Sequence, residues 1–396
     1  MGYRTYTCPI AQACGGCELL AVPYPVQLER KQAHVQELLG EAAEKDGAII
    51  EQIRGMEKPV AYRLKAATPF ASGKGGHVKC GFYAAGTHHI VPCESCLVED
   101  PRARRILNAV AHVAERLHVS AYDEDKGKGV LRNAVVRLGY ASDDALLVIV
   151  TNGSELPHLE RFVSELRTQC PELTSVVQNV NTRRTNAILG RLNKTLYGPG
   201  NMHDQLLGCT FEIGPSSFYQ TNPAQTEVLY RLALDGARLL PGQRMLDAYC
   251  GTGTIGICAA SHVNDLHVVG VEQVSDAVSC ARRNAQANGL GERCRFLRSD
   301  ATDYMDATVR LASPDNRFDV VIMDPPRSGS TPKFLAGVTR LGPSRIAYVS
   351  CSVSTQARDI TILRDYGYRP ERVTPVDMFP HTKHVETVAI LVRETR

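Results

Sequence analysis

Cys351 and Glu386 are the residues whose types and positions best fit a nucleophile and a base. Cys351 follows the apolar, β-branched run 345–350, which predicts a buried strand ending at the thiol. A thiolate there can add to an electron-poor ring carbon, and a small buried hydrophobe is the alternative. Glu386 precedes the last apolar run, where desolvation would raise its pKa toward that of a useful base. A solvated carboxylate is the alternative for Glu386, and His381 and His384 are rival bases.

Cysteines near the start of the chain have the spacing of metal ligands. Cys8, Cys14 and Cys17 form a C-x5-C-x2-C pattern, and Cys93 or Cys96 would supply a fourth ligand. One possible site is tetrahedral zinc, held by Cys14, Cys17 and the later pair. The other is a [4Fe-4S] cluster, which would use the three early cysteines and one later cysteine. The residues alone leave both open.

A glycine-rich turn marks a candidate nucleotide-type site. Gly251, Gly253 and Gly256 follow the predicted strand 244–249 and open a predicted helix, where glycines let the backbone turn sharply and approach a ligand. Glu272 ends the next predicted strand, and a carboxylate there can accept both hydroxyl hydrogens of a ribose.

Two further acidic residues follow predicted strands. Asp300 ends the segment 294–300, where an acceptor could meet an adenine amino group. Asp324 begins an Asp-Pro-Pro corner at the carboxyl end of the fourth strand, the edge where ligands bind in open α/β folds. Together with the glycine turn, these positions resemble the class I S-adenosylmethionine-dependent methyltransferases.

Within that frame the thiol and the carboxylate fit methylation of a pyrimidine at C5. C5 is too weak a nucleophile until a group such as the Cys351 thiolate adds at C6, and a base such as Glu386 must then remove the C5 proton. Gln220 offers an amide donor and acceptor suited to a uracil edge, and Phe218 could stack on a base. Asn222, which precedes a proline, also predicts a helix start in this stretch.

Three stretches of the chain differ in pattern and would position these residues. With 396 residues, the chain is too long for one ordinary core. Residues 1–100 form a cysteine-rich segment with one predicted helix at 24–45, and residues 101–214 read as an α+β domain. Residues 215–396 alternate short apolar strands with helices, which predicts an α/β domain with a doubly wound parallel sheet.

Composition narrows the class of protein. No apolar run is long enough for a membrane helix, and the N-terminus lacks the pattern of a signal peptide, so we expect a cytoplasmic protein. The thirteen cysteines are then not expected to form a disulfide framework. A net charge of +3 does not by itself indicate a nucleic-acid partner.

Motifs along the whole chain resemble the bacterial RNA uracil-C5 methyltransferases. In the order of that family they are Ser-Phe-Tyr-Gln-Thr-Asn (217–222), Asp-Ala-Tyr-Cys-Gly-Thr-Gly-Thr (247–254), Asp-Pro-Pro-Arg (324–327), Ser-Cys (350–351) and His-Val-Glu-Thr-Val (384–388). The resemblance implies that Cys351 is the nucleophile and Glu386 the base. It also implies a cofactor and uracil pocket lined by Gln220, Tyr249, Thr254, Glu272, Asp300 and Asp324, with Phe218, Gln220 and Asp324 touching the substrate.

The same resemblance favours the cluster over zinc. The ribosomal-RNA branch of the family carries a [4Fe-4S] cluster with this first spacing, and the implied ligands are Cys8, Cys14, Cys17 and Cys96. Transfer-RNA members generally lack the cluster, so 23S ribosomal RNA is the implied substrate and residues 101–214 would bind it. Many cluster-bearing relatives begin with a small RNA-binding barrel, whereas only seven residues precede Cys8 here.

The expectation is thus a monomeric S-adenosylmethionine-dependent enzyme whose partner is RNA, with no protein partner and no membrane. Three alternatives stay open: a tRNA uracil-C5 methyltransferase, an RNA cytosine-C5 methyltransferase and a non-catalytic iron–sulfur RNA-binding protein. The cytosine enzymes usually carry a second cysteine where this chain has Asp-Pro-Pro-Arg. The presence of Cys351, Glu386 and the cofactor motifs speaks against the third.

Overall fold

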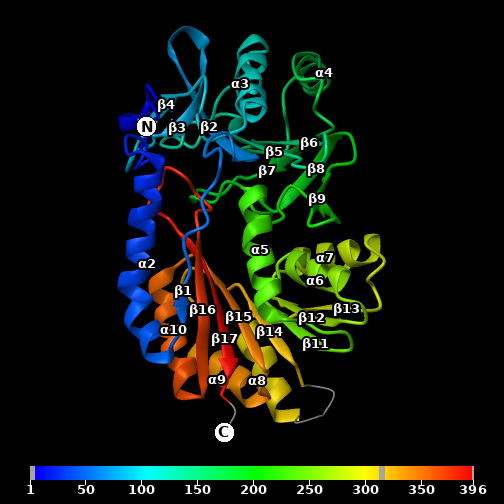
Figure 1. Cartoon of the computed structure of the whole chain (residues 1–396). Helices are drawn as coiled ribbons and strands as arrows, with labels where there is room; N and C mark the ends of the chain where they lie inside the picture. The colour runs from blue at the N-terminus through cyan, green and yellow to red at the C-terminus, as the bar shows by residue number, and fades with distance from the viewer. Residues whose placement is uncertain (1–4, 312–316, 395–396) are drawn as a thin grey trace.

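A mixed eight-stranded sheet forms the lower half of the molecule (Figure 1). The computed structural model describes residues 5–311 and 317–394. The spatial order of the strands is β1 (Ile49–Ile50), β16 (Tyr368–Val376), β17 (Glu386–Arg393), β15 (Arg345–Ser350), β14 (Val320–Met323), β11 (Arg244–Ala248), β12 (His267–Glu272) and β13 (Cys294–Arg298). The predicted strands of the last third of the chain therefore all lie in one sheet.

Helices cover both faces of this sheet, as the doubly wound prediction requires. Alternate residues of each strand point to opposite apolar cores: Met245 packs with one core and Leu246 with the other. The helices of the first face are α5 (Pro223–Ala237), α6 (Thr254–His262) and α7 (Ser275–Ala287); those of the second are α2 (Tyr24–Asp46), α8 (Ala301–Leu311), α9 (Pro332–Leu341) and α10 (Val353–Asp365).

The sheet departs from the predicted parallel arrangement at one side. Strands β13, β12, β11, β14 and β15 are parallel, but β17 runs antiparallel to both β15 and β16. The reason is the connection: residues 377–385 join β16 to β17 as a loop, whereas parallel neighbours need a longer crossover. Consequently the first residue of β17 lies at the edge where the parallel strands end.

A second sheet forms the upper half (Figure 1). Its α3 (Pro101–Arg116) and α4 (Leu159–Gln169) pack on one face, while Val135, Val148 and Val177 of the other face share a core with the lower half. The strand order is β4 (Ile90–Pro92), β3 (Val78–Tyr83), β2 (Lys65–Ser72), β5 (Leu131–Leu138), β6 (Ala145–Thr151), β7 (Ser175–Val180) and β8 (Leu192–Tyr197). A hairpin of β9 (Met202–Leu206) and β10 (Cys209–Ile213) leads from this sheet to α5, and the short helices are α1 (Ala11–Cys14) and η1 (Lys74–Gly76).

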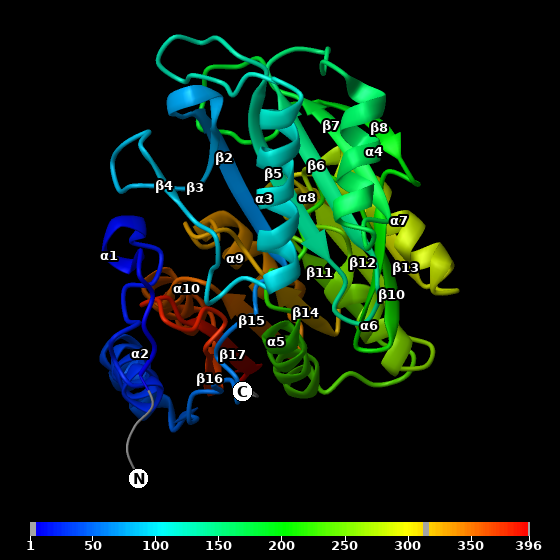
Figure 2. The same cartoon turned by 90° about the horizontal axis from the view of Figure 1, so that it is seen from above.

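The predicted boundary at residue 100 runs through the upper sheet. Strands β2 to β4 precede it in the sequence yet pair with β5, which follows it. The helix predicted at 24–45 is confirmed as α2, but it packs on α10 and β16 of the lower half, and Figure 2 shows it beside α10. Both the course of the upper sheet across residue 100 and the packing of α2 depend on contacts between segments far apart in the sequence. Local sequence patterns do not predict such contacts.

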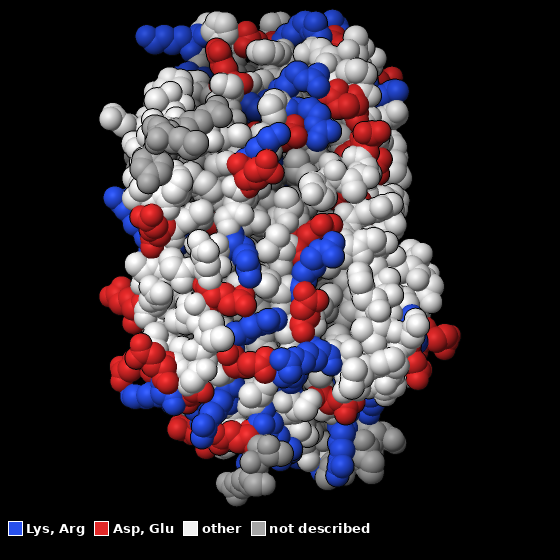
Figure 3. Space-filling model, in the orientation of Figure 1, with Lys and Arg blue, Asp and Glu red and all other residues white. Residues whose placement is uncertain are grey.

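The surface carries both signs of charge. On the face drawn in Figure 3, Lys and Arg lie among Asp and Glu along the middle of the molecule. This mixture agrees with the small net charge of +3. In the described part of the chain, no helix is both long and apolar enough to span a membrane.

Candidate active site

A cavity of about 510 Å³ lies where the two halves meet, at the edge where the parallel strands of the lower sheet end. Ligand pockets typically have volumes of roughly 300–1,000 Å³. Lys65 and Leu206 line the cavity from the upper half, and the remaining walls come from the segment before α5, from α5 itself, and from strand ends and loops of the lower half. The lining includes most of the predicted site residues: Phe218, Gln220, Tyr249, Thr254, Glu272, Asp324, Cys351 and Glu386.

Cys351 and Glu386 lie at neighbouring ends of two paired strands. The antiparallel register pairs Val349 with Val388 and Ser350 with Thr387, so the last pair stands next to Cys351 on one strand and to Glu386 on the other. Both residues line the cavity, and Glu386 is close enough to raise the pKa of the thiol. The thiol and the carboxylate can therefore act on neighbouring atoms of one bound ring.

The electrostatics of this pair fit acid–base work. Glu386 is only 6% exposed, and burial followed by the nearby Asp324 raises its pKa to about 8. Burial also raises the pKa of Asp324 to about 7. The pKa of the Cys351 thiol is raised by burial and then by Glu386 and Asp324, while Arg327 opposes the rise. Near neutral pH, Glu386 and Asp324 can therefore each gain or lose a proton, as acid–base catalysis requires.

The glycine turn presents a carboxylate to the cavity. The backbone N–H of Gly251 donates to Glu272 Oε2 at 3.2 Å, and that of Val274 donates to Oε1 at 2.8 Å. Each oxygen keeps a lone pair free for a ligand hydroxyl. Below the turn, buried Asp247 accepts the N–H of Gly256 at 2.9 Å and ties the helix start to β11. These contacts fit the ribose contact predicted for Glu272.

Tyr249 and Thr254 lie on either side of this turn. Tyr249 has a left-handed backbone (φ 63°), which costs a non-glycine residue roughly 1–3 kcal/mol and occurs mainly at functional sites. Its hydroxyl is 2.7 Å from Ser330 Oγ. Thr254 Oγ1 lies 2.9 Å from the hydroxyl of Tyr230, which also lines the cavity. Both side chains are thus fixed by buried partners while they line the cavity.

Asp300 is the one predicted cofactor residue that does not line the cavity. Its Oδ1 accepts the backbone N–H groups of Thr302 and Asp303, at 2.8 and 3.2 Å, and so caps the start of α8. The helix begins immediately after the strand, and its unpaired N–H groups bind the nearest carboxylate. Asp300 is close enough to Tyr249 to raise the pKa of that phenol, although burial is the largest cause. Its prediction as an adenine contact stays untested.

Neither rival histidine is placed as a base. His381 is fully buried, and its Nε2 lies 2.8 Å from the Pro59 carbonyl, to which it must donate. Its Nδ1 lies 3.1 Å from Gln27 Nε2, so both ring nitrogens are occupied. His384 is exposed, packs edge-on against Phe379 at 6.4 Å, and does not line the cavity.

Several lining residues were missed from the sequence, among them Lys65, Tyr230, Arg327 and Phe379. Lys65 begins β2, and burial, then the neighbouring Arg137, lowers its pKa to about 8. Nothing local in the sequence marks it, because its contact with the site spans two sheets. Arg327 could have been found, since it belongs to the Asp-Pro-Pro-Arg corner that was singled out for its aspartate.

Five cysteines line a second, small cavity near the start of the chain. They are Cys8, Cys14, Cys17, Cys93 and Cys96, and Ile10, Phe82 and Leu97 supply apolar walls. Burial, followed by the neighbouring Cys96, raises the pKa of Cys17 to about 11. Within residues 5–311 and 317–394, no three Cys, His, Asp or Glu side chains converge on a point where they could hold one metal ion. A tetrahedral zinc site would bring four thiolates within about 4 Å of one another.

Comparisons with known proteins agree with this geometry. A sequence model described as a methyltransferase domain matches residues 239–368. A protein of Halalkalibacterium halodurans named as an uncharacterized RNA methyltransferase is 38% identical over 384 residues, covering 97% of this chain and 82% of its own length. One of the same name from Caldanaerobacter subterraneus is 39% identical over 390 residues, covering 98% and 84%.

Among solved structures, the chain is similar to the tRNA (uracil-54, C5)-methyltransferase of Pyrococcus abyssi in complex with S-adenosyl-L-homocysteine. The TM-score is 0.78 with 27% sequence identity, and the match covers 96% of this chain and 86% of that one. The likeness therefore extends over both halves of the molecule.

Proposed function

The chain belongs to the S-adenosylmethionine-dependent RNA methyltransferases, and from this premise we propose that it methylates C5 of a uridine in 23S ribosomal RNA. The observation that carries the proposal is that Cys351 and Glu386 line the same cavity as the glycine turn and Glu272, close enough for Glu386 to raise the pKa of the thiol. The similar archaeal structure, named as a uracil-C5 enzyme, supports the choice of base and atom.

Cys351 and Glu386 would divide the chemistry between them. The Cys351 thiolate adds to C6, and the electron pair displaced from the C5–C6 double bond makes C5 nucleophilic. S-Adenosylmethionine supplies the methyl group: the C5–methyl bond forms, and the sulfur–methyl bond breaks with its electron pair on the departing sulfur. Glu386 then removes the C5 proton, the double bond re-forms, and Cys351 leaves as thiolate.

Three side chains would orient the target base. Phe218 is 65% exposed at the rim of the cavity, where its ring can stack on a base that has left its helical stack. Gln220 and Asp324 line the cavity deeper in and offer the donors and acceptors that a uracil edge needs. With these contacts, the proposal is a monomeric cytoplasmic enzyme acting on RNA.

Methyl transfer from labelled S-adenosylmethionine to unmodified 23S ribosomal RNA and, separately, to unmodified transfer RNA tests the proposal. We expect 5-methyluridine, identified by mass, in the ribosomal RNA. Label in transfer RNA alone would keep the chemistry and overturn the substrate; the similar archaeal tRNA enzyme makes this the second candidate. 5-Methylcytidine would contradict the choice of base, and no label in either RNA would contradict catalysis.

The rate at which the methylated adduct breaks down should rise with pH. Glu386 can accept the C5 proton only after losing its own, and its pKa is raised to about 8. Below pH 7 the rate of adduct decay under single turnover should rise about tenfold per pH unit, and it should level off above about pH 8–9. Rapid-quench measurements from pH 6 to pH 9.5 check this. A flat or falling profile would rule out Glu386 as the base.

We further propose that Cys8, Cys14, Cys17 and Cys96 hold a [4Fe-4S] cluster. The donor set fits, because these four thiols line one apolar cavity, and cysteine thiolates are the ligands that hold such clusters. Cys93 also lines the cavity but is buried, and its Sγ lies 3.2 Å from the Ser95 carbonyl. Holding the segment around Cys17 in place is the role we assign to the cluster, because methyl transfer moves no net electrons.

Cys96→Ser should remove most of the iron, whereas Cys93→Ser should retain it. Protein purified without oxygen should contain about four iron and four sulfide per chain. Chemical iron and sulfide determination, with the visible absorbance of the cluster, measures the effect independently of activity. If Cys93→Ser loses iron and Cys96→Ser keeps it, the fourth ligand is Cys93 and not Cys96. About one zinc per chain in place of iron would contradict the cluster.

A further inference from the structure

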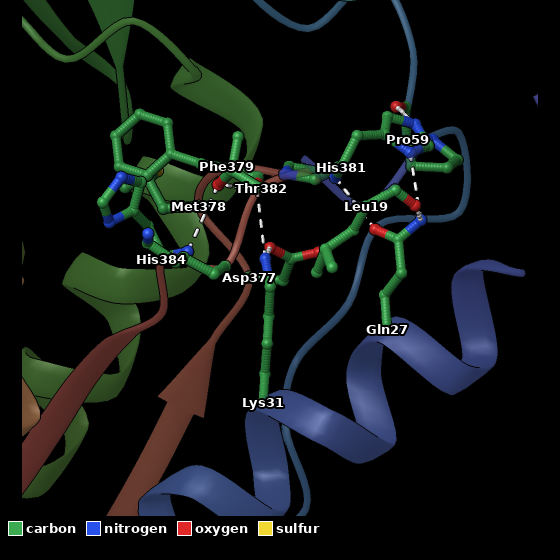
Figure 4. A network of polar contacts seen from close by, with 12 residues as sticks. Leu19, Gln27, Lys31, Pro59, Asp377, Met378, Phe379, His381, Thr382 and His384 are labelled. Atoms are coloured by element: carbon green, nitrogen blue, oxygen red, sulfur yellow. Dashed lines mark hydrogen bonds and ion pairs between the residues drawn. The ribbon is translucent and has the colours of Figure 1, made fainter. Parts of the chain in front are cut away.

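The loop 377–385 carries the cavity residue Phe379 and ends at the base Glu386. Pairing of Val376 with Glu386 closes the loop at its foot, so a shift in the loop would move the base. Helix α2, from the far end of the sequence, holds this loop through a network of polar contacts (Figure 4).

The first part of the network is a buried ion pair. Lys31 Nζ lies 2.5 Å from Asp377 Oδ1, and the two side chains are 2% and 0% exposed. The same ammonium donates to the Phe379 carbonyl at 3.1 Å, and Tyr24, also on α2, donates from its hydroxyl to Asp377 Oδ2 at 2.7 Å. One face of α2 therefore occupies both carboxylate oxygens at the start of the loop and a backbone carbonyl two residues later.

The second part fixes the middle of the loop. Gln27 Oε1 accepts the backbone N–H of His381 at 2.9 Å, and its Nε2 lies 3.1 Å from His381 Nδ1. His381 has a left-handed backbone (φ 67°), a conformation that a non-glycine residue keeps only when its surroundings determine it. Gln27 also donates to the carbonyls of Leu19 and Val22, so it joins the loop to the segment that precedes α2.

The third part connects the loop to α5. Asn222 Nδ2 donates to the Met378 carbonyl at 2.9 Å, and Gln225 Nε2 donates to the Asp377 carbonyl at 3.0 Å. Both donors stand at the start of α5, directly after Phe218 and Gln220. Helices α2 and α5 therefore both hold the loop, and the α2 residues Gln27 and Lys31 do not line the cavity.

We propose that Gln27 and Lys31 are positioning residues for the proton-abstraction step, holding the loop 377–385 so that Glu386 meets the C5 proton. The inference rests on the function proposed above. Cys351 directly follows β15 and takes no part in the network, so addition of the thiol should not depend on Gln27 or Lys31. Loss of either residue should slow the step after methyl transfer and leave the earlier steps alone.

Gln27→Met tests this, because it keeps the volume of the buried side chain and removes both hydrogen-bonding groups. Under single turnover with substrate RNA, we expect covalent protein–RNA adduct to form within about twofold of the normal rate and to decay about tenfold to a hundredfold more slowly. The KM for RNA should change less than about twofold. Glu386→Gln, which lacks the base, serves as the reference in which the adduct forms but does not decay.

Gln36→Met is the matched control, since Gln36 lies on the same helix and is exposed. It should turn over normally, and accumulation of adduct in it would overturn the inference. Lys31→Met provides a second test of the network should Gln27→Met fail to fold. If adduct accumulates in Glu386→Gln but decays at the normal rate in Gln27→Met and Lys31→Met, the inference about α2 is overturned and the proposed function stands. Absence of adduct from Glu386→Gln as well would overturn the proposed function with it.

Discussion

Replacing Cys351 with alanine will abolish methyl transfer while leaving S-adenosylmethionine binding nearly unchanged. Without the thiolate, C5 of uracil never gains the electron density to attack a methyl group, so the rate should fall on the order of 10⁴-fold or more. Glu272, the predicted ribose ligand, and the glycine turn belong to other strands, and the carboxylates of Glu272 and Asp247 accept hydrogen bonds from Gly251, Val274 and Gly256 rather than from Cys351. The Kd for the cofactor should therefore stay within about threefold.

Rapid-quench transfer assays and calorimetric titration with S-adenosylmethionine measure the two quantities. Cys250→Ala is the matched control, because Cys250 lines the same cavity but lies buried in the glycine turn. We expect Cys250→Ala to retain turnover within about tenfold of the unaltered enzyme. Turnover by Cys351→Ala, or its loss in both variants alike, would contradict the assignment of Cys351 as the nucleophile.

Replacing Glu386 with glutamine will trap the enzyme on its RNA. The amide has the size of the carboxylate but cannot accept the C5 proton, so the methylated ring cannot expel the thiol. The change also removes a negative charge that raises the pKa of Cys351, so adduct formation should proceed at least as readily as before. Multiple-turnover rates should fall by about 10³-fold or more, while one methyl group per chain is still transferred.

A denaturing gel should show a retarded protein–RNA species that carries label from S-adenosylmethionine. The double variant Cys351→Ala with Glu386→Gln serves as the control and should show no such species. If Glu386→Gln releases methylated RNA at the normal rate, another group removes the proton. Retarded material in the double variant would mean that the bond to RNA does not involve Cys351.

Local patterns were sufficient to predict the strands and the residues at their ends. Apolar runs of five or six residues end at Glu272 and just before Asp324 and Cys351, and parallel strands bring such ends to one edge. The thiol and the carboxylate could be proposed for the same reason. Their mutual position could not, because it depends on β17 running antiparallel to β15. A period-two apolar pattern reads the same in either direction.

Other features of the site depend on contacts between distant parts of the chain. Lys65 reaches the cavity from the upper sheet. His381 cannot act as a base because Gln27 and the Pro59 carbonyl occupy its two ring nitrogens. Asp300 has the expected position after a strand, and the start of α8 uses its Oδ1 as a cap, which the sequence pattern did not predict; its prediction as an adenine contact stays untested. In each case the competing partner is set by packing that no short window of sequence contains.

The docking of α2 and β1 on β16 also dictates when the molecule can be completed during synthesis. Ile49 and Ile50 pair with Arg372 and Val373, so an early strand waits for a partner that lies far later in the sequence. Until that partner is made, the apolar face of α2 around Val35 and Leu39 has nowhere to pack, which makes the nascent chain vulnerable to aggregation. Closing so long a loop late also gives slow final folding. Helix α2 can therefore dock and hold the loop before Glu386, the proposed base, only after β16 and that loop have been synthesised.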